Sequence, residues 1–77
     1  MTQDRLLPLV AGVLGIDPGA LSDDAKMGST AKWDSLRHVM IMAEIERAYG
    51  LKFSAREMVR SASVRDLRGV LAARGVS

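Results

Sequence analysis

Residues 31–50 read AKWDSLRHVMIMAEIERAYG, and this stretch decides the fold. Asp34 is a favourable N-cap residue, Gly50 is a favourable C-cap residue, and the apolar residues between them recur at helical spacing. The pattern predicts a helix over residues 35–49. Ser35 is then its first residue, where free backbone N–H groups and the positive end of the helix dipole favour a bound anion.

The apolar residues of this predicted helix fall on two arcs when it is wound at about 100° per residue. One arc is suited to a core, and its members are His38, Ile41, Met42, Ile45, Ala48 and Tyr49. The other arc contains Leu36, Val39, Met40 and Ala43. This second arc either packs on the loop before the helix or forms an exposed contact surface for partners, and the pattern leaves both open. Ser35 lies on the seam between the two arcs.

The N-terminal part of the chain predicts one helix and one long loop. Leucines and valines at helical spacing predict a helix over about residues 2–14, closed by Gly15. Pro8 is compatible only with a first turn, so this helix either starts late or bends there. Residues 16–33 show no sustained periodicity. A loop this long in so small a domain is more often functional than idle.

Two further helix starts are visible after residue 50. Ser54 and Ser63 each precede an acidic residue by three positions, a pattern typical of capping boxes. They predict a short helix near 54–60 and another near 63–74. No segment alternates apolar and polar residues with a period of two, so we expect no sheet. The sequence therefore predicts an all-α fold, a small up-and-down bundle of three main helices and one short helix, in a single domain over residues 1–77.

The composition excludes several kinds of site. The chain has 77 residues, no Cys and a single His. It therefore offers neither a disulfide nor a thiolate nucleophile, and we expect no metal site. No apolar run approaches the ~18 residues of a membrane span, and the first residues do not resemble a secretory signal. We expect a soluble, cytoplasmic, monomeric protein that does not bind membranes.

The charged residues are unevenly distributed along the chain but do not form blocks of one sign. From residue 39 onward there are seven Lys and Arg against four Asp and Glu, and the net charge of the chain is +2. The opposite charges are interspersed, which favours a mixed-sign surface over a nucleic-acid patch. Only three aromatic residues are present, which also disfavours base stacking.

Asp34-Ser35-Leu36, after a loop rich in Gly and Asp and at the start of an apolar helix, resembles the attachment site of the acyl carrier protein family. The resemblance continues through WDSLRHVMIMAEIERAYGLKFS, REM and SVRDL, and GIDPGAL with the following Asp-Asp pair is similar to the first loop of that family. It covers nearly the whole chain. Asp-Ser-Leu alone is a weak motif, but together with the loop, the helix order and the chain length it is specific.

The resemblance implies that the chain is a carrier and not itself an enzyme. A phosphopantetheinyl transferase would attach 4′-phosphopantetheine from coenzyme A to the Ser35 hydroxyl, with Asp34 and Leu36 flanking the site. The thiol of this arm would carry acyl, aminoacyl or polyketide units as thioesters. The partners implied are an acyl- or aminoacyl-loading enzyme and an acyltransferase or synthase that accepts the unit.

The chain also departs from the family pattern. The corresponding family helix is often strongly acidic, whereas Arg37, Met40 and Arg47 stand here where acids often occur. The sequence is therefore more similar to a discrete carrier of a specialised pathway. We expect its partners to contact the second arc, which consists of Leu36, Val39, Met40 and Ala43.

Two other functions are compatible with parts of the sequence. A small helical protein- or nucleic-acid-binding module would account for the high pI, and helices 54–60 and 63–74 loosely resemble a helix-turn-helix, but these helices contain Glu57 and Asp66. A serine hydrolase would use Ser35 and His38 with an aspartate. The chain, however, lacks the Gly-x-Ser-x-Gly motif of a nucleophile elbow, and its 77 residues leave little room for a substrate cleft.

Overall fold

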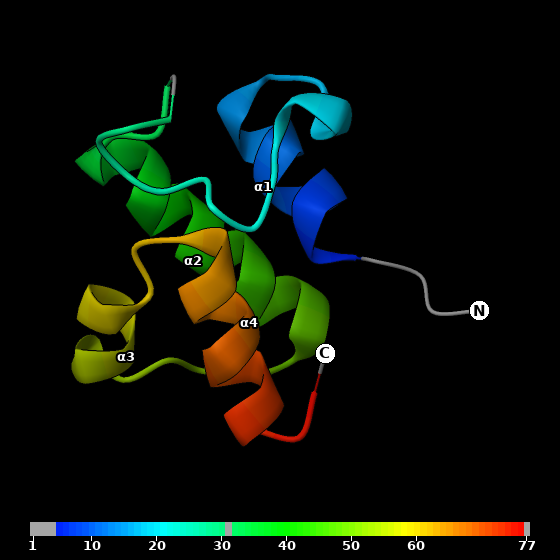
Figure 1. The fold of residues 1–77 in the computed structure, drawn as a ribbon. Coiled ribbons are helices and arrows are strands. Elements are labelled where there is room, and N and C mark those ends of the chain that lie inside the picture. The colour runs from blue at the N-terminus through cyan, green and yellow to red at the C-terminus, as the bar shows by residue number, and fades with distance from the viewer. Residues whose placement is uncertain (1–4, 31, 77) are drawn as a thin grey trace.

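The computed structural model describes residues 5–30 and 32–76, and it confirms the all-α prediction. The part of the chain that it describes contains no strand, only an isolated bridge between Lys26 and Ser63. Three longer helices, one short helix and a 3₁₀ turn follow one another (Figure 1) in the order α1 (Leu6–Leu14), η1 (Pro18–Ala20), α2 (Ser35–Tyr49), α3 (Ala55–Arg60) and α4 (Val64–Ala73).

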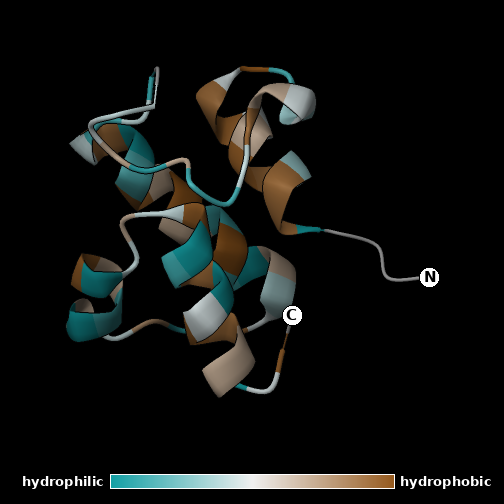
Figure 2. Ribbon diagram, in the orientation of Figure 1, coloured by the Kyte–Doolittle hydropathy of each residue, from teal (hydrophilic) through white to brown (hydrophobic). Residues whose placement is uncertain are grey.

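The core lies where the three longer helices meet. Helix α1 contacts both α2 and α4, and in Figure 2 it is largely hydrophobic, whereas α2 and α4 carry both polar and apolar residues. The helical residues buried at this junction are Leu6, Val10, Ala11, Leu14, Ile41, Met42, Ile45, Val64, Leu67 and Leu71. Each helix therefore contributes one apolar stripe to a shared interior.

Helix α1 begins later than the spacing of its apolar residues suggested. The predicted start at residue 2 lies outside the described residues, but Arg5 precedes the helix, which begins at Leu6. Pro8 is therefore the third helical residue, where its missing N–H group would have had no partner within the helix. Gly15 closes the helix with a left-handed φ of 72°, as expected for a C-cap glycine.

All three predicted N-caps are present. The Asp34 carboxylate accepts a hydrogen bond from the backbone N–H of Arg37, at 2.8 Å. Ser54 forms a full capping box with Glu57, and the Ser63 hydroxyl accepts from a backbone N–H of the first turn of α4. Because each cap satisfies a free donor of a first turn, the helices begin where the sequence predicts.

The long loop between α1 and α2 is anchored at several points. Leu21 and Trp33 are buried. The N–H of Met27 donates to the carbonyl of Ala62 at 2.8 Å, and the N–H of Val64 donates to the carbonyl of Ala25 at 2.9 Å. The loop therefore packs against the start of α4 and leaves the second arc of α2 uncovered.

One residue of the predicted core arc is placed differently. Ala48 is exposed, and its carbonyl accepts a hydrogen bond from the Arg5 guanidinium at 3.0 Å. Tyr49 is only half-buried, with the Arg5 guanidinium 4.6 Å from its ring centroid. Arg5 therefore contacts the last turn of α2 at both Ala48 and Tyr49.

Candidate functional site

Ser35 is the first residue of α2, and its side chain is exposed. Asp34 precedes it in extended conformation and turns its carboxylate back onto the helix as the N-cap. Within the described residues, no hydrogen bond of the Ser35 hydroxyl is found. The hydroxyl is therefore accessible, at a helix end where a negative charge is stabilised by the dipole and the first N–H groups.

The start of α2 is held against the end of α1. The Arg37 guanidinium donates a hydrogen bond to the carbonyl of Val13 at 2.9 Å, close to the C-terminal end of α1. There a positive charge complements the partial negative charge of the last carbonyl groups. Arg37 thereby fixes the first turn of α2 against α1.

His38 is buried beside Ser35 and has both ring nitrogens occupied. The Trp33 indole N–H donates to Nδ1 of His38 at 3.2 Å, and Nε2 of His38 lies 3.1 Å from the carbonyl oxygen of Met58. An acceptor Nδ1 and a donor Nε2 define the neutral Nε2–H tautomer. Because neither nitrogen is free to accept a proton from Ser35, and because Asp34 caps the helix, these residues do not form a hydrolase triad.

Two open clefts flank Ser35. The more polar one has a volume of about 540 Å³ and is lined by Met27, Gly28, Thr30, Lys32, Trp33, Asp34 and Ser35. The more apolar one has a volume of about 330 Å³ and is lined by Met27, Ser35, His38, Val39, Met58 and Val59. Lys32 is the only residue other than glycine in the described part of the chain with a positive φ, 69°. It adds a positive charge to the polar cleft.

The second apolar arc of α2 is exposed beside Ser35. The exposed fractions are 68% for Leu36, 62% for Val39 and 45% for Met40, and Ala43 is also exposed. The alternative in which this arc packs on the preceding loop is therefore wrong. Met40 and Ala43 also border an open cleft of about 430 Å³ against α1. Together these residues form an apolar strip that starts next to Ser35.

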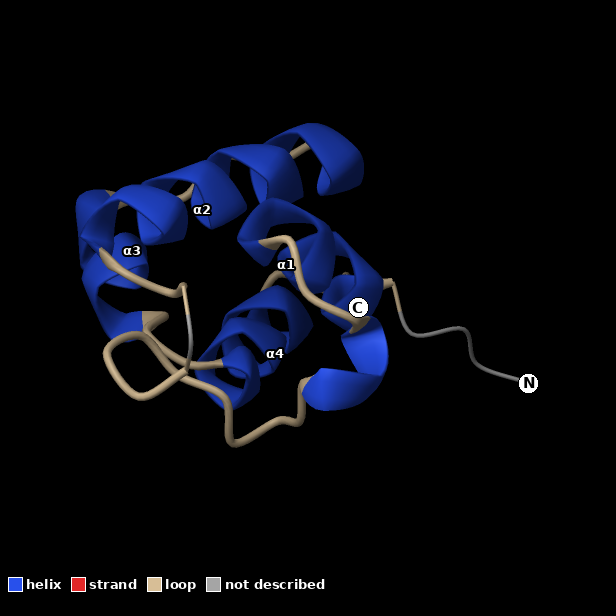
Figure 3. Ribbon diagram, turned by 90° about the horizontal axis from the view of Figure 1, so that it is seen from above, coloured by secondary structure: helices blue, strands red, loops and turns tan. Residues whose placement is uncertain are grey.

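Besides the arc of α2, the short helix α3 also exposes an apolar residue, and the sequence patterns gave no indication of it. Val59 of α3 is 80% exposed and lines the apolar cleft together with Val39. Figure 3 shows α3 beside the N-terminal half of α2. A valine in a six-residue helix shows no periodicity of its own, so the sequence offered no signal for this placement.

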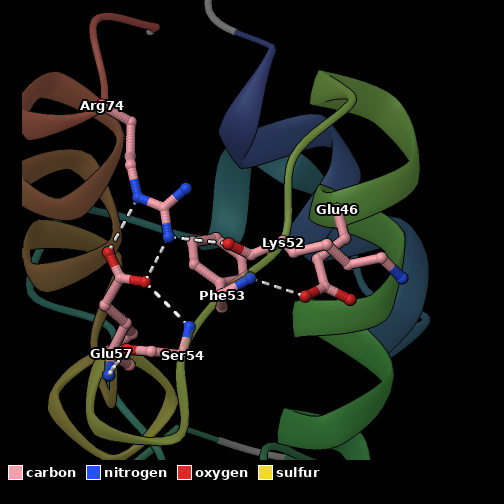
Figure 4. A network of polar contacts seen from close by, with 7 residues as sticks. Glu46, Lys52, Phe53, Ser54, Glu57 and Arg74 are labelled. Carbon is pink, nitrogen blue, oxygen red and sulfur yellow. Dashed lines mark hydrogen bonds and ion pairs between the residues drawn. The ribbon is translucent and has the colours of Figure 1, made fainter.

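A polar network fixes α3 in this position (Figure 4). The Arg74 guanidinium donates to the Glu57 carboxylate, at 3.0 Å from Nε to Oε2, and to the carbonyl of Lys52 at 2.7 Å. The Glu46 carboxylate accepts from the backbone N–H of Phe53 at 2.7 Å. The hydrogen bond from Arg74, with that from the Ser54 backbone, lowers the pKa of Glu57 from 4.5 to about 2. The network thus ties α3 to α4 and to the end of α2.

This site fits a covalent arm better than an enclosed substrate. The described residues contain no group of three or more His, Cys, Asp or Glu side chains arranged to hold a metal ion. Across residues 5–30 and 32–76, no helix is long and apolar enough to cross a membrane. An exposed Ser35 hydroxyl at a helix N-terminus, between two open clefts, accommodates a phosphodiester and leaves room for a chain extending from it.

No curated protein sequence matches the chain. The family model for the phosphopantetheine attachment site matches residues 4–71. Since this match spans most of the 77 residues, the chain belongs to the phosphopantetheine attachment family and is a non-catalytic carrier that bears a covalent 4′-phosphopantetheine arm for acyl or peptidyl intermediates.

Proposed function

We propose that Ser35 is the residue that carries the 4′-phosphopantetheine arm. The observation that supports this assignment is its exposed hydroxyl, which has no hydrogen-bond partner within the described residues, on the first residue of a capped helix. Ser54 and Ser63 use their hydroxyls as helix caps, and Ser61 is buried. Ser35 combines exposure with the N-terminus of a fifteen-residue helix.

In the attachment step, the Ser35 oxygen attacks the phosphorus of coenzyme A that bears the pantetheine. A new O–P bond forms, the bond to 3′,5′-ADP breaks, and the hydroxyl proton passes to a base of the transferase. The product is a phosphodiester with one negative charge, which the N-terminal dipole of α2 stabilises. Asp34 contributes by capping that helix end, and Leu36 contributes an apolar side chain next to the arm.

The arm supplies a thiol that holds the cargo as a thioester. The chain contains no Cys, so no thiol of its own competes for the cargo. We assign residues 1–77 to one carrier domain. Arg37 and Arg47, at positions of α2 where acids often occur in the family, favour a carrier of a specialised pathway, which takes an acyl, aminoacyl or polyketide unit from a loading enzyme and delivers it to an acyltransferase or synthase.

The exposed arc of α2 is the surface that we assign to these partners. Leu36, Val39, Met40 and Ala43 lie exposed on the face beside Ser35. An enzyme that acts on the arm must approach Ser35 and therefore covers part of this face. Burial of the large apolar side chains in such a contact would contribute favourably to binding.

The test is the intact mass after incubation with coenzyme A and a broad-specificity phosphopantetheinyl transferase. The wild type should gain one phosphopantetheine, and Ser35→Ala should gain none while its circular dichroism spectrum stays helical. Ser29→Ala removes an exposed hydroxyl from the preceding loop and is the matched control, which should be modified like the wild type. Full modification of Ser35→Ala would refute the assignment.

A further inference from the structure

Helix α3 presents one apolar and two basic side chains to solvent near Ser35. Val59 and Arg60 follow Arg56 by three and four residues, which places all three on one side of the helix. Val59 lines the apolar cleft that also contains Ser35. Arg56 and Arg60 are exposed and line a different open cleft, between α3 and α4. Helix α3 therefore carries an apolar side chain in the cleft at Ser35 and two basic side chains in the cleft beside α4.

The two arginines differ from several others in having no acidic partner. Arg47 pairs with Glu44, Arg65 with Asp24 and Arg74 with Glu57. Arg56 and Arg60 form no ion pair or hydrogen bond through their side chains within the described residues. Asp66 lines the same cleft from α4 but pairs with neither of them.

The arginines are presented by a fixed helix. Ser54 and Glu57 form a capping box at its start, and Arg74 holds Glu57 from α4. On the side facing α2, the carbonyl of Met58 contacts Nε2 of His38 at 3.1 Å. Because α3 is tied to its neighbours on both sides, its exposed face needs little reorganisation when a partner binds.

We propose that Val39, Val59, Arg56 and Arg60 form the docking surface for the phosphopantetheinyl transferase that modifies this chain, and that this transferase presents an apolar patch edged by carboxylates. The inference rests on the proposed function, since it takes Ser35 as the target. The transferase must place its active site at Ser35, and the apolar cleft connects Ser35 directly to Val59. Two unpaired guanidinium groups on the same short helix as Val59 match carboxylates, with which arginine forms paired hydrogen bonds.

The experiment compares Arg56→Glu/Arg60→Glu with a variant of equal charge change, Arg47→Glu/Lys52→Glu. Arg47 lies in the last turn of α2, roughly 18 Å from Ser35 along the helix, and Lys52 lies in the loop that follows α2. The enzyme is the transferase of the host cell. The rate of modification is measured against the concentration of the carrier and, separately, of coenzyme A.

We expect the KM for the α3 variant as substrate to rise at least tenfold, with kcat and the KM for coenzyme A unchanged. The control variant should differ from the wild type by less than twofold. Raising the salt concentration should increase the KM of the wild type, lower that of Arg56→Glu/Arg60→Glu and have little effect on that of Arg56→Gln/Arg60→Gln, because salt screens both the attraction and the repulsion between rim charges. Arg56→Gln/Arg60→Gln removes the charges without reversing them and should show a smaller change in the same direction.

Four results would overturn the inference. The first two are an unchanged KM for the α3 variants as substrates and an equal rise in the KM of the control variant. The third is a rise in the KM for coenzyme A instead of the KM for the carrier. The fourth is salt-sensitive binding of DNA or RNA by the wild type that is lost in the α3 variant. Each of these leaves Ser35 as the attachment site. Absence of modification in the wild type would overturn both the inference and the proposed function, so the two failures are distinguishable.

Discussion

The Trp33 indole N–H donates a hydrogen bond to Nδ1 of His38 at 3.2 Å, and the two rings are stacked with their centroids 6.1 Å apart. Trp33 ends the loop before α2, and His38 lies one turn into α2. The other nitrogen of His38 contacts the carbonyl of Met58 in α3. One buried imidazole therefore connects the loop, the helix that starts with Ser35 and the short helix beside it.

Removing the donor of this contact should destabilise the fold. In Trp33→Phe the ring remains aromatic and apolar, but Nδ1 of the buried His38 loses its partner. An unsatisfied buried acceptor costs about 1–3 kcal/mol, and the smaller ring adds a cavity. Urea unfolding should show a loss of at least this size. Leu36→Ala, at an exposed position nearby, is the control and should change the free energy of unfolding by no more than ~0.5 kcal/mol. Equal stability of Trp33→Phe and wild type would contradict the role given to this contact.

The stability contributed by Glu57 should depend on pH. Its pKa in the folded state is about 2, below the ordinary value of 4.5, because Arg74 and the Ser54 backbone donate to the carboxylate. A lowered folded pKa stabilises the fold above pH 4.5, and this stabilisation is lost as the pH falls from 4.5 toward 2. Glu57→Gln should therefore be less stable than wild type at pH 7, and the difference should shrink in acid.

Chemical denaturation at pH 7 and pH 3 measures this difference. Glu44→Gln is the matched control, because Glu44 pairs with Arg47 on the exposed surface of α2. The control should show a small effect at neutral pH, as expected of a surface pair. A Glu57→Gln deficit that stays constant or grows as the pH is lowered would show that the pairing with Arg74 is not its source.

Asp34 should contribute to stability and to the modification of Ser35 through its hydrogen bond more than through its charge. Asp34→Ala removes the acceptor for the N–H of Arg37 and should lower the free energy of unfolding by about 1 kcal/mol. Asp34→Asn keeps a capping oxygen and should lose much less. The rate of modification of Ser35 measured on both variants separates the two roles. If Asp34→Asn is modified as slowly as Asp34→Ala, the transferase recognises the carboxylate charge itself.

Met40→Glu tests the exposed arc of α2 as a partner surface. Met40 is 45% exposed, so the substitution should change stability by no more than ~0.5 kcal/mol. Transfer of cargo to the cognate partner should nevertheless fall, mostly through faster dissociation. Ala48→Glu places the same charge on another exposed position of α2 and should leave transfer unchanged. Normal transfer by a stable Met40→Glu variant would exclude this surface, as would a large drop in its melting temperature.

The elements of this fold were predictable because their start and stop signals are local. Asp34 and Ser54 cap helices through backbone atoms three residues away, and Gly15 permits the left-handed turn that ends α1. Such interactions depend on neighbouring residues only, so a short stretch of sequence contains all of the information. The same locality made Ser35 recognisable as the first residue of α2.

The surroundings of the site depend on contacts that no local pattern contains. Winding α2 gave two apolar arcs, but which arc is covered is decided by α1 and α4, and Ala48 proved exposed for the same reason. The Trp33–His38 contact joins a loop residue to a helix face, and Glu57 pairs with Arg74, which lies seventeen residues further along the chain. The presence of Val59 in the same cleft as Val39 likewise follows from how α3 packs.

The central claim is that the arm is attached to Ser35, and peptide mapping tests it most directly. Trypsin cleaves after Lys32 and Arg37 and releases the peptide Trp33–Arg37, in which Ser35 carries the only hydroxyl group. After modification of the wild type, mass spectrometry should find one phosphopantetheine on this peptide and none on any other. An unmodified Trp33–Arg37 peptide, together with phosphopantetheine on another peptide of the same sample, would contradict the claim.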